Sequence, residues 1–135
     1  MRIKTLLSIA ALSFTCHAFA ANQVSFLEPK DGADVTNPVK VRFGVEGMKI
    51  GPLGDLTPNT GHHHLIIGDK GVTKGESVPF DDKHLHFGKG QTETEVTLPP
   101  GEHHLTLQFA NGAHQSYGPE MSKTIHVHVV DAPKK

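Results

Sequence analysis

The stretch HHLTLQFA (His103–Ala110) alternates apolar and polar side chains over most of its length. Because side chains two residues apart on a β-strand lie on the same face, this alternation predicts a strand that is buried on one side. Leu105, Leu107 and Phe109 are expected to face inward. The residues expected to face outward are His104, Thr106 and Gln108. An apolar face of this kind needs a second layer to cover it, so the stretch indicates a layered β fold.

Similar β-branched runs, separated by Gly and Pro, recur along the chain without a sustained helical periodicity. Strands are predicted at Gln23–Leu27, Val39–Val45, His63–Ile67, Glu93–Leu98, His103–Ala110 and Lys123–Val130, with a weaker one at His84–Phe87. Turn-forming sequences lie between them, including Pro99-Pro100-Gly101 and Asn111-Gly112. About seven short strands in a chain of 135 residues predict an all-β, immunoglobulin-like two-sheet β-sandwich.

The first twenty residues have the features of a cleavable secretory signal peptide. Arg2 and Lys4 flank the start of an apolar run that reaches Leu12, and Ala18-Phe19-Ala20 is a small-x-small cleavage site. The apolar run is too short to span a membrane, and no later stretch is long and apolar enough to do so. We therefore expect a signal peptide at residues 1–20, one domain at residues 21–131 and a flexible tail at residues 132–135. The mature protein is expected in the periplasm or outside the cell.

Composition excludes several function classes. The single cysteine, Cys16, lies in the predicted signal peptide, which excludes disulfides, thiolate metal sites, iron–sulfur clusters and cysteine catalysis from the mature chain. Without Arg2 and Lys4, 11 of the 13 basic side chains remain against 14 acidic ones, a net charge of −3 with neutral histidines. No basic stripe is present, so nucleic acid and anionic membranes are not expected partners.

Histidine clustering is the feature that points to chemistry, because neutral imidazole is a common ligand of late first-row metals. Ten of the eleven histidines follow the predicted signal peptide. In an immunoglobulin-like sandwich, the loops after the second, fourth and sixth strands meet at one pole. This arrangement predicts a metal site there from His62, His63, His64, His84, His86 and His114. The i, i+2 spacing within the first and second groups places two imidazoles on one face of a strand, where both can bind one ion.

Two parts of this assignment stay open. His63 has the same parity as Leu65 and Ile67, so it is equally consistent with a buried core histidine. Antiparallel pairing of the last two strands predicts His104 opposite His128, with His126 one step along. That second group can bind metal, but ordinary polar alternation on a solvent-facing surface is the simpler interpretation. His103 is expected at the opposite pole and outside the main site.

Several motifs resemble those of an uncharacterised family of small exported bacterial domains, a domain of unknown function. They are GHHHL at residues 61–65, HFGKGQTE at 86–93, LPPGEHHLTLQFA at 98–110, and His114 followed by SYGP at 116–119. The resemblance extends from about Leu27 to Val130 and implies a one-domain periplasmic protein with no established reaction. The histidines that match the family pattern are His62, His63, His64, His86, His103 and His114. His104, His126 and His128 lie outside it.

These observations favour a periplasmic module that binds Cu(II) or Zn(II) and buffers or delivers the ion. One alternative is an envelope module that binds a periplasmic protein partner without metal, using Tyr117, Lys89 and Gln91 at the same pole. A second is a small metalloenzyme of the superoxide-handling type, in which three histidines leave a coordination position open. Catalysis is the less favoured of these functions because no acid or base has a clear catalytic spacing.

Overall fold

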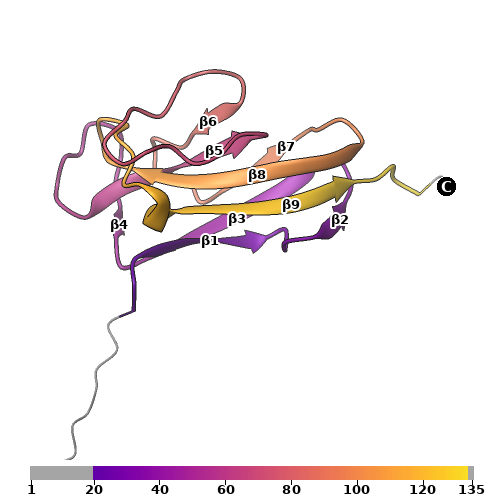
Figure 1. Ribbon diagram of the computed structural model, residues 1–135, viewed down its shortest axis with the longest axis horizontal. Coiled ribbons are helices and arrows are strands. Elements are labelled where there is room, and N and C mark those ends of the chain that lie inside the picture. The colour runs from indigo at the N-terminus through magenta and orange to yellow at the C-terminus, as the bar shows by residue number, and fades with distance from the viewer. Residues whose placement is uncertain (1–19, 134–135) are drawn as a thin grey trace, which may run out of the picture.

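The computed structural model describes residues 20–133. The predicted signal peptide lies outside the described residues apart from Ala20, and so do the last two residues of the predicted tail. The described chain forms the strands β1 (Gln23–Glu28), β2 (Ala33–Val35), β3 (Val39–Glu46), β4 (Lys49–Ile50), β5 (Thr60–Ile67), β6 (His84–His86), β7 (Glu93–Val96), β8 (Gly101–Ala110) and β9 (Ser122–Val129), with one short 3-10 helix, η1 (Pro119–Met121) (Figure 1). No helix in this range is long and apolar enough to cross a membrane.

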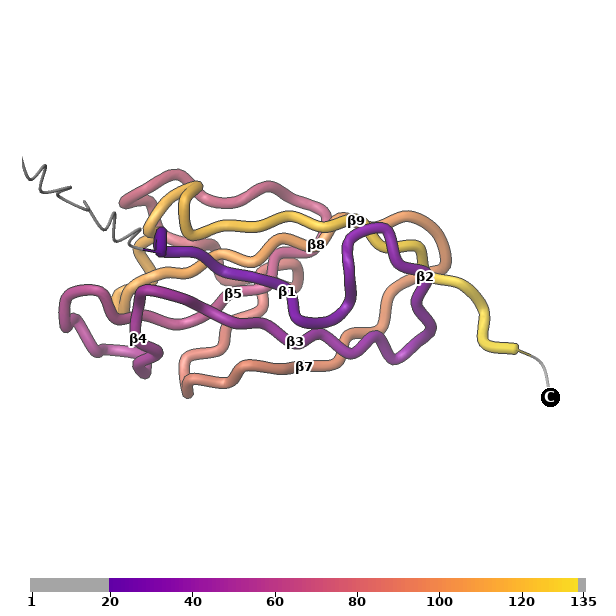
Figure 2. Tube along the Cα trace, turned by 90° about the horizontal axis from the view of Figure 1, so that it is seen from below, coloured from indigo at the N-terminus to yellow at the C-terminus, as the bar shows by residue number. Residues whose placement is uncertain are grey.

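The strands form two sheets. The smaller sheet has the order β1-β3-β7, which Figure 2 shows from below. The larger sheet has the order β2-β9-β8-β5-β4, and β6 also pairs with β5. In an immunoglobulin-like sandwich the first, second and fifth strands share one sheet, and the third, sixth and seventh share the other. The first, second and fifth predicted strands are β1, β3 and β7, and they form the smaller sheet. The third, sixth and seventh are β5, β8 and β9, and they lie in the larger sheet. The predicted immunoglobulin-like sandwich is therefore confirmed.

Three strands differ from the prediction. β2 and β4 were not predicted, because strands of three and two residues are too short to show a pattern. β6 corresponds to the weaker strand predicted at His84–Phe87, the fourth of the seven, and in an immunoglobulin-like sandwich the fourth strand lies in the sheet of the first, second and fifth strands. β6 pairs instead with β5, with His64 opposite His86 and Ile66 opposite His84. This pairing moves both β6 histidines onto the larger sheet.

The main core lies between the two sheets. Leu105, Leu107 and Phe109 of β8 face inward, as predicted, and are fully buried. Val41 and Phe43 of β3 cover them from the smaller sheet. Burial of one such side chain stabilises the fold by about 1.5–3 kcal/mol, which is why the alternation at residues 103–110 holds β8 at the centre.

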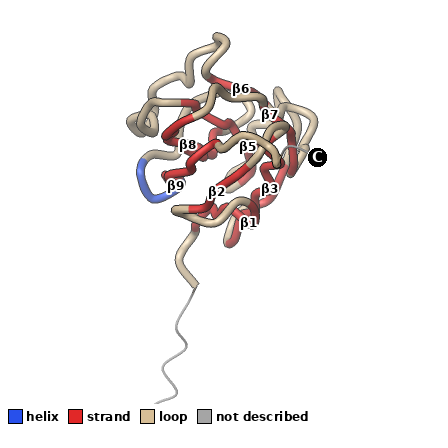
Figure 3. Tube along the Cα trace, turned by 90° about the vertical axis from the view of Figure 1, so that its right-hand side faces the viewer, coloured by secondary structure: helices blue, strands red, loops and turns tan. Residues whose placement is uncertain are grey.

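The outer face of the larger sheet is also covered. The connection from β5 to β6 (residues 68–83) lies on the side of β5 and β8 that faces away from β1 (Figure 1). Thr106 faces outward as predicted but is buried, and its hydroxyl donates a hydrogen bond to the Asp69 carbonyl. Gln108 is buried in the same way, and its side-chain oxygen accepts a hydrogen bond from the Val72 amide. Figure 3 shows that loops, rather than a layer of helices, form this cover.

Candidate metal centre

Four histidines meet under this cover on the outer face of the larger sheet. His62 and His64 come from β5, His86 ends β6, and His114 lies in the connection from β8 to β9. Each ring offers one nitrogen, and these four nitrogens all lie within 4.8 Å of one another. The predicted convergence of distant histidines therefore occurs, although it takes place on a sheet face that loops cover.

Local structure explains how each ring reaches the group. His62 and His64 are two residues apart on β5 and therefore share its outer face. His86 pairs directly with His64 across the antiparallel β5–β6 ladder. His114 has a φ of 62°, in the left-handed region that non-glycine residues rarely adopt. The side chain of Asn111 holds this turn, because its oxygen accepts hydrogen bonds from the amides of Ala113 and Gln115.

The distances favour a cation at the centre. His86 Nε2 lies 2.9 Å from His62 Nε2 and 2.9 Å from His114 Nε2. A neutral imidazole nitrogen carries either one proton or one lone pair, so His86 Nε2 cannot make a well-aligned hydrogen bond to both neighbours. Nitrogens that bind one ion tetrahedrally at about 2.0–2.1 Å are roughly 3.3 Å apart. Small movements of the rings would therefore bring four nitrogens onto one ion, and the group can hold a metal.

The electrostatics favour the neutral form of His62, His64 and His86, which metal binding requires. Burial, followed by the charges of the neighbouring imidazoles, lowers the pKa of His62 to about 4 and that of His64 to about 3. Burial and then His114 also lower the pKa of His86. The carbonyls of Gly51 and Gln108 act in the opposite direction and raise the pKa of His62 and His64, respectively.

His63 lies on the inner face of β5 and does not belong to the group. Its ring packs between Phe43 and Phe109, with ring centroids 4.7 and 5.0 Å away. Neither ring nitrogen has a hydrogen-bond partner among the described residues, and burial lowers the pKa of His63 to about 4. The sequence left open whether His63 is a metal ligand or a core histidine, and the structure places it in the core.

His84 is the other predicted residue that lies outside the group. It pairs with Ile66 on β5, one step further along the sheet from the pair formed by His64 and His86. Its Nδ1 lies 2.7 Å from the Asp81 carboxylate, so its ring already has a hydrogen-bond partner. Four of the six predicted residues are thus brought together, and His63 and His84 are not.

The histidines of the last two strands also differ from the expectation. His104 pairs with His126, and Glu102 pairs with His128, so the predicted register was wrong by two residues. Ser122 pairs with Gln108 rather than with Ala110, because the last two residues of β8, Phe109 and Ala110, extend beyond the segment that pairs with β9. His104 and His126 face each other, with ring centroids 4.4 Å apart.

His103 lies where it was expected, away from the four-histidine group. Its Nε2 lies 2.7 Å from the Pro99 carbonyl, in the turn between β7 and β8 at the other end of the sandwich. This contact with the Pro99 carbonyl gives His103 a structural role that needs no metal.

Gly88 is a residue of the site that the sequence analysis did not identify. A Cβ atom at this position would lie 2.3 Å from Cε1 and 2.7 Å from Nε2 of His86. Only glycine therefore leaves room for the His86 ring in its present position. The run of glycines and lysine after His86 indicates a turn, but not which side chain the turn accommodates.

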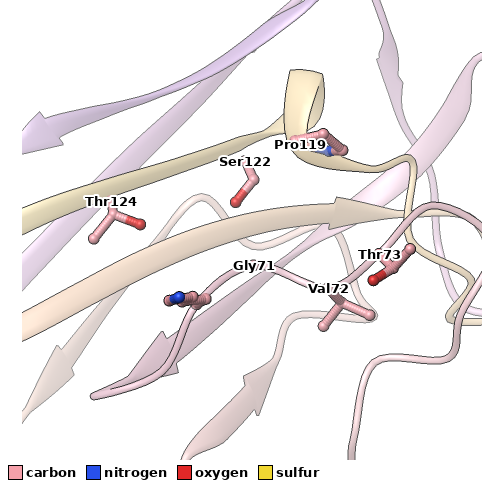
Figure 4. Close-up of a pocket in the computed structure, with 7 residues that line it drawn as sticks. Gly71, Val72, Thr73, Pro119, Ser122 and Thr124 are labelled. Atoms are coloured by element: carbon pink, nitrogen blue, oxygen red, sulfur yellow. The ribbon is translucent and has the colours of Figure 1, made fainter.

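A hollow of about 390 Å³ lies on the same outer face of the larger sheet (Figure 4). Hydroxyl groups of Thr73, Ser122 and Thr124 line it, together with Lys70. No member of the four-histidine group contributes to this lining. The four-histidine group and the hollow are therefore separate features of this face.

Comparison with models of known protein families identifies one matching family. Residues 41–130 match the model of a family described as "Domain of unknown function (DUF4399)". The chain belongs to this family. The resemblance inferred from the motifs is thereby confirmed, and the matched segment contains all four histidines of the group. Comparison with curated proteins finds no match.

A solved structure with a similar fold is the endo-beta-1,4-mannanase from Thermotoga petrophila. The two chains are 23% identical and have a TM-score of 0.52, with 87% of this chain and 22% of that chain covered. The present chain thus spans about a fifth of that protein. At this level of identity the likeness supports the sandwich fold alone.

Proposed function

We propose that this protein binds a divalent transition-metal ion, Zn(II) or Cu(II), through His62, His64, His86 and His114. In this proposal the protein is an exported module that buffers or delivers the ion. The observation that carries the proposal is the position of His86 Nε2, 2.9 Å from the Nε2 atoms of two other rings. A shared cation accounts for both short distances, whereas shared protons satisfy only one of them.

The donor set narrows the choice of metal. Four imidazoles and no thiolate favour Cu(II) or Zn(II) over the harder ions Mg(II) and Ca(II), which prefer oxygen ligands. At equal concentrations the Irving–Williams order favours Cu(II), whereas a tetrahedral arrangement of four nitrogens favours Zn(II). The two metals therefore compete for one site, and supply in the cell decides which is bound.

The number of donors favours binding over catalysis. Catalytic zinc sites keep three protein ligands and an open position for water, whereas four protein ligands fill a tetrahedral shell. In addition, His62 and His64 are buried, and only His86 and His114 are partly accessible to solvent. An ion can leave or arrive on the side of these two rings without opening the sandwich.

The cellular location follows from the sequence of the first twenty residues, which supports export by a cleavable signal peptide. A site made of nitrogen ligands suits an oxidising compartment, because imidazole does not form disulfides as a thiolate does. The protein would thus hold the ion in the periplasm or outside the cell.

Calorimetric titration of the tag-free protein with ZnCl2 and with CuCl2 tests the proposal. We expect one tight equivalent with submicromolar affinity, and we expect His86→Ala to weaken it by more than about 100-fold. His103→Ala is the matched control, because it removes a histidine that is bonded to the Pro99 carbonyl at the other end of the molecule. Absence of saturable binding tighter than micromolar for both ions would contradict the proposal.

A further inference from the structure

A second pair of histidines lies on the outer face of the larger sheet, away from the four-histidine group. His104 on β8 and His126 on β9 are direct cross-strand partners. His104 lies four residues before Gln108, which pairs with His64, and this spacing corresponds to about 13 Å along the strand. No ligand of the four-histidine group can therefore complete a site at this pair.

The backbone brings the two side chains together. The His126 carbonyl accepts a hydrogen bond from the Gly32 amide, and the His126 amide donates one to the Asp31 carboxylate. Both backbone groups of His126 thus point away from β8, which makes His104 and His126 a non-hydrogen-bonded pair. In such pairs the Cα atoms are only about 4.5 Å apart and the side chains lie closer than in hydrogen-bonded pairs.

The two rings have nearly the same relative placement as two rings of the four-histidine group. The centroids of His104 and His126 are 4.4 Å apart, with an interplanar angle of 74°. The centroids of His86 and His114 are 4.5 Å apart, with an angle of 81°. The centroid distance and interplanar angle of one pair in the four-histidine group therefore recur at His104 and His126.

An aspartate adds negative charge beside the pair. The carboxylate of Asp31 lies 3.5 Å from His126 Nδ1, and both side chains are more than half exposed to solvent. A carboxylate near Nδ1 fixes the proton on that nitrogen and leaves Nε2 free to bind a metal, as in many metal sites. Two other histidines on this side of the sheet also have an aspartate next to Nδ1. The distance from Nδ1 to the carboxylate oxygen is 2.7 Å for His84 with Asp81 and 3.1 Å for His128 with Asp34.

We propose that His104 and His126 form a second metal site, open to solvent, that binds Cu(II) in preference to Zn(II). Two imidazole nitrogens, with oxygens from water, make the mixed nitrogen and oxygen set that Cu(II) prefers in tetragonal geometry. Two protein nitrogens bind an ion less tightly than four, so this site is the weaker and more readily exchanged of the two. It goes beyond the proposed function, because it binds an ion with no contribution from the four-histidine group.

Titration of the tag-free protein with CuCl2, followed by calorimetry and native mass spectrometry, tests this site. We expect two bound equivalents, the second at least tenfold weaker than the first. His126→Gln should weaken the second equivalent at least tenfold and leave the first unchanged. His128→Gln is the matched control, since it removes another exposed, aspartate-facing histidine of β9 that does not face His104.

Different outcomes would contradict the four-histidine site and the site at His104 and His126. The double variant His86→Ala/His114→Ala should lose the tight equivalent and keep the weak one. A protein that binds only one Cu(II), or whose second equivalent survives His126→Gln, would rule out the second site. Loss of the second equivalent in His128→Gln as well as in His126→Gln would also rule it out, because binding would then be spread over exposed histidines in general. A wild-type protein with only the weak, His126-dependent equivalent would contradict the proposed function and support the second site.

Discussion

The two faces of β5 carry three consecutive histidines that are equally buried but differ in their surroundings. His62, His63 and His64 have exposed fractions of 0, 0 and 2%. On the outer face, the rings of His62 and His64 meet nitrogens of other imidazoles. On the inner face, the ring of His63 meets the carbon atoms of Phe43 and Phe109. Burial of a histidine therefore does not identify a ligand, whereas the atoms that face its nitrogens do.

This difference has an energetic consequence. Removing an imidazole from water costs free energy unless its nitrogens find partners. In the proposed function, an ion bound by His62 and His64 offsets part of that cost on the outer face, although the Nδ1 atoms of both rings have no hydrogen-bond partner among the described residues. The stabilisation of the folded chain grows with the logarithm of the ion concentration. His63 has no such partner among the described residues, so its cost is present whether or not an ion is bound. In the proposed function, the stability of the outer face therefore depends on metal, and that of the inner face does not.

The same substitution on the two faces should produce the largest contrast. His64→Leu is expected to weaken binding of Zn(II) or Cu(II) by more than about 100-fold, because it removes a ligand. His63→Leu should change the affinity by less than about threefold, since its ring lies in the core. Chelator competition measures both affinities, and circular dichroism checks that each variant is folded. An equal loss of affinity in the two variants would remove the distinction between the faces.

Acid should destabilise the metal-free protein through both faces. The pKa values of His62 and His63 are about 4 and that of His64 is about 3, all below the ordinary value of 6.5. As the pH falls from about 6.5 to about 4, the unfolded chain binds protons that the folded chain does not. The free energy of unfolding therefore falls as the pH falls through this window, by at most about 1.4 kcal/mol per pH unit for each ring, and is independent of these rings above about pH 7.

Urea unfolding in the presence of a chelator at several pH values measures this dependence. His63→Leu removes one of the rings whose pKa is lowered, so its slope should be smaller than that of the wild-type protein, while its stability at pH 7 should not fall. A stability that is flat between pH 4.5 and 6.5 would show that the rings accept protons in the folded chain as readily as in the unfolded chain.

The comparison also shows which parts of the site the sequence can predict. The alternation at residues 103–110 predicts β8, and the i, i+2 spacing predicts that His62 and His64 share a face, because both follow from strand geometry alone. Strand geometry alone does not predict that His84 lies outside the four-histidine group, since the position of His84 depends on which sheet β6 joins. The burial of Thr106 and Gln108 was not predicted either. The segment that covers them, residues 68–83, has no periodic pattern that would reveal where it packs.

A smaller effect should separate the ligands held by strands from the ligand held by a loop. His114 depends on the Asn111 side chain, which accepts two backbone hydrogen bonds in its turn. Asn111→Ala should therefore weaken metal binding by roughly tenfold, in the range observed when a group that positions a ligand is lost. Most of this loss is expected in the dissociation rate, because His114 lies on the partly exposed side of the site.

Asn37→Ala is the matched control for this variant. Asn37 also makes two hydrogen bonds to the backbone, donating to the Leu98 carbonyl and accepting from the Leu98 amide, but far along the chain from the metal centre. Both variants should lower the melting temperature by a few degrees, and only Asn111→Ala should release the ion faster to a chelator in stopped-flow measurements. Equal release rates in the two variants would mean that the rings of β5 and β6 hold the ion without His114.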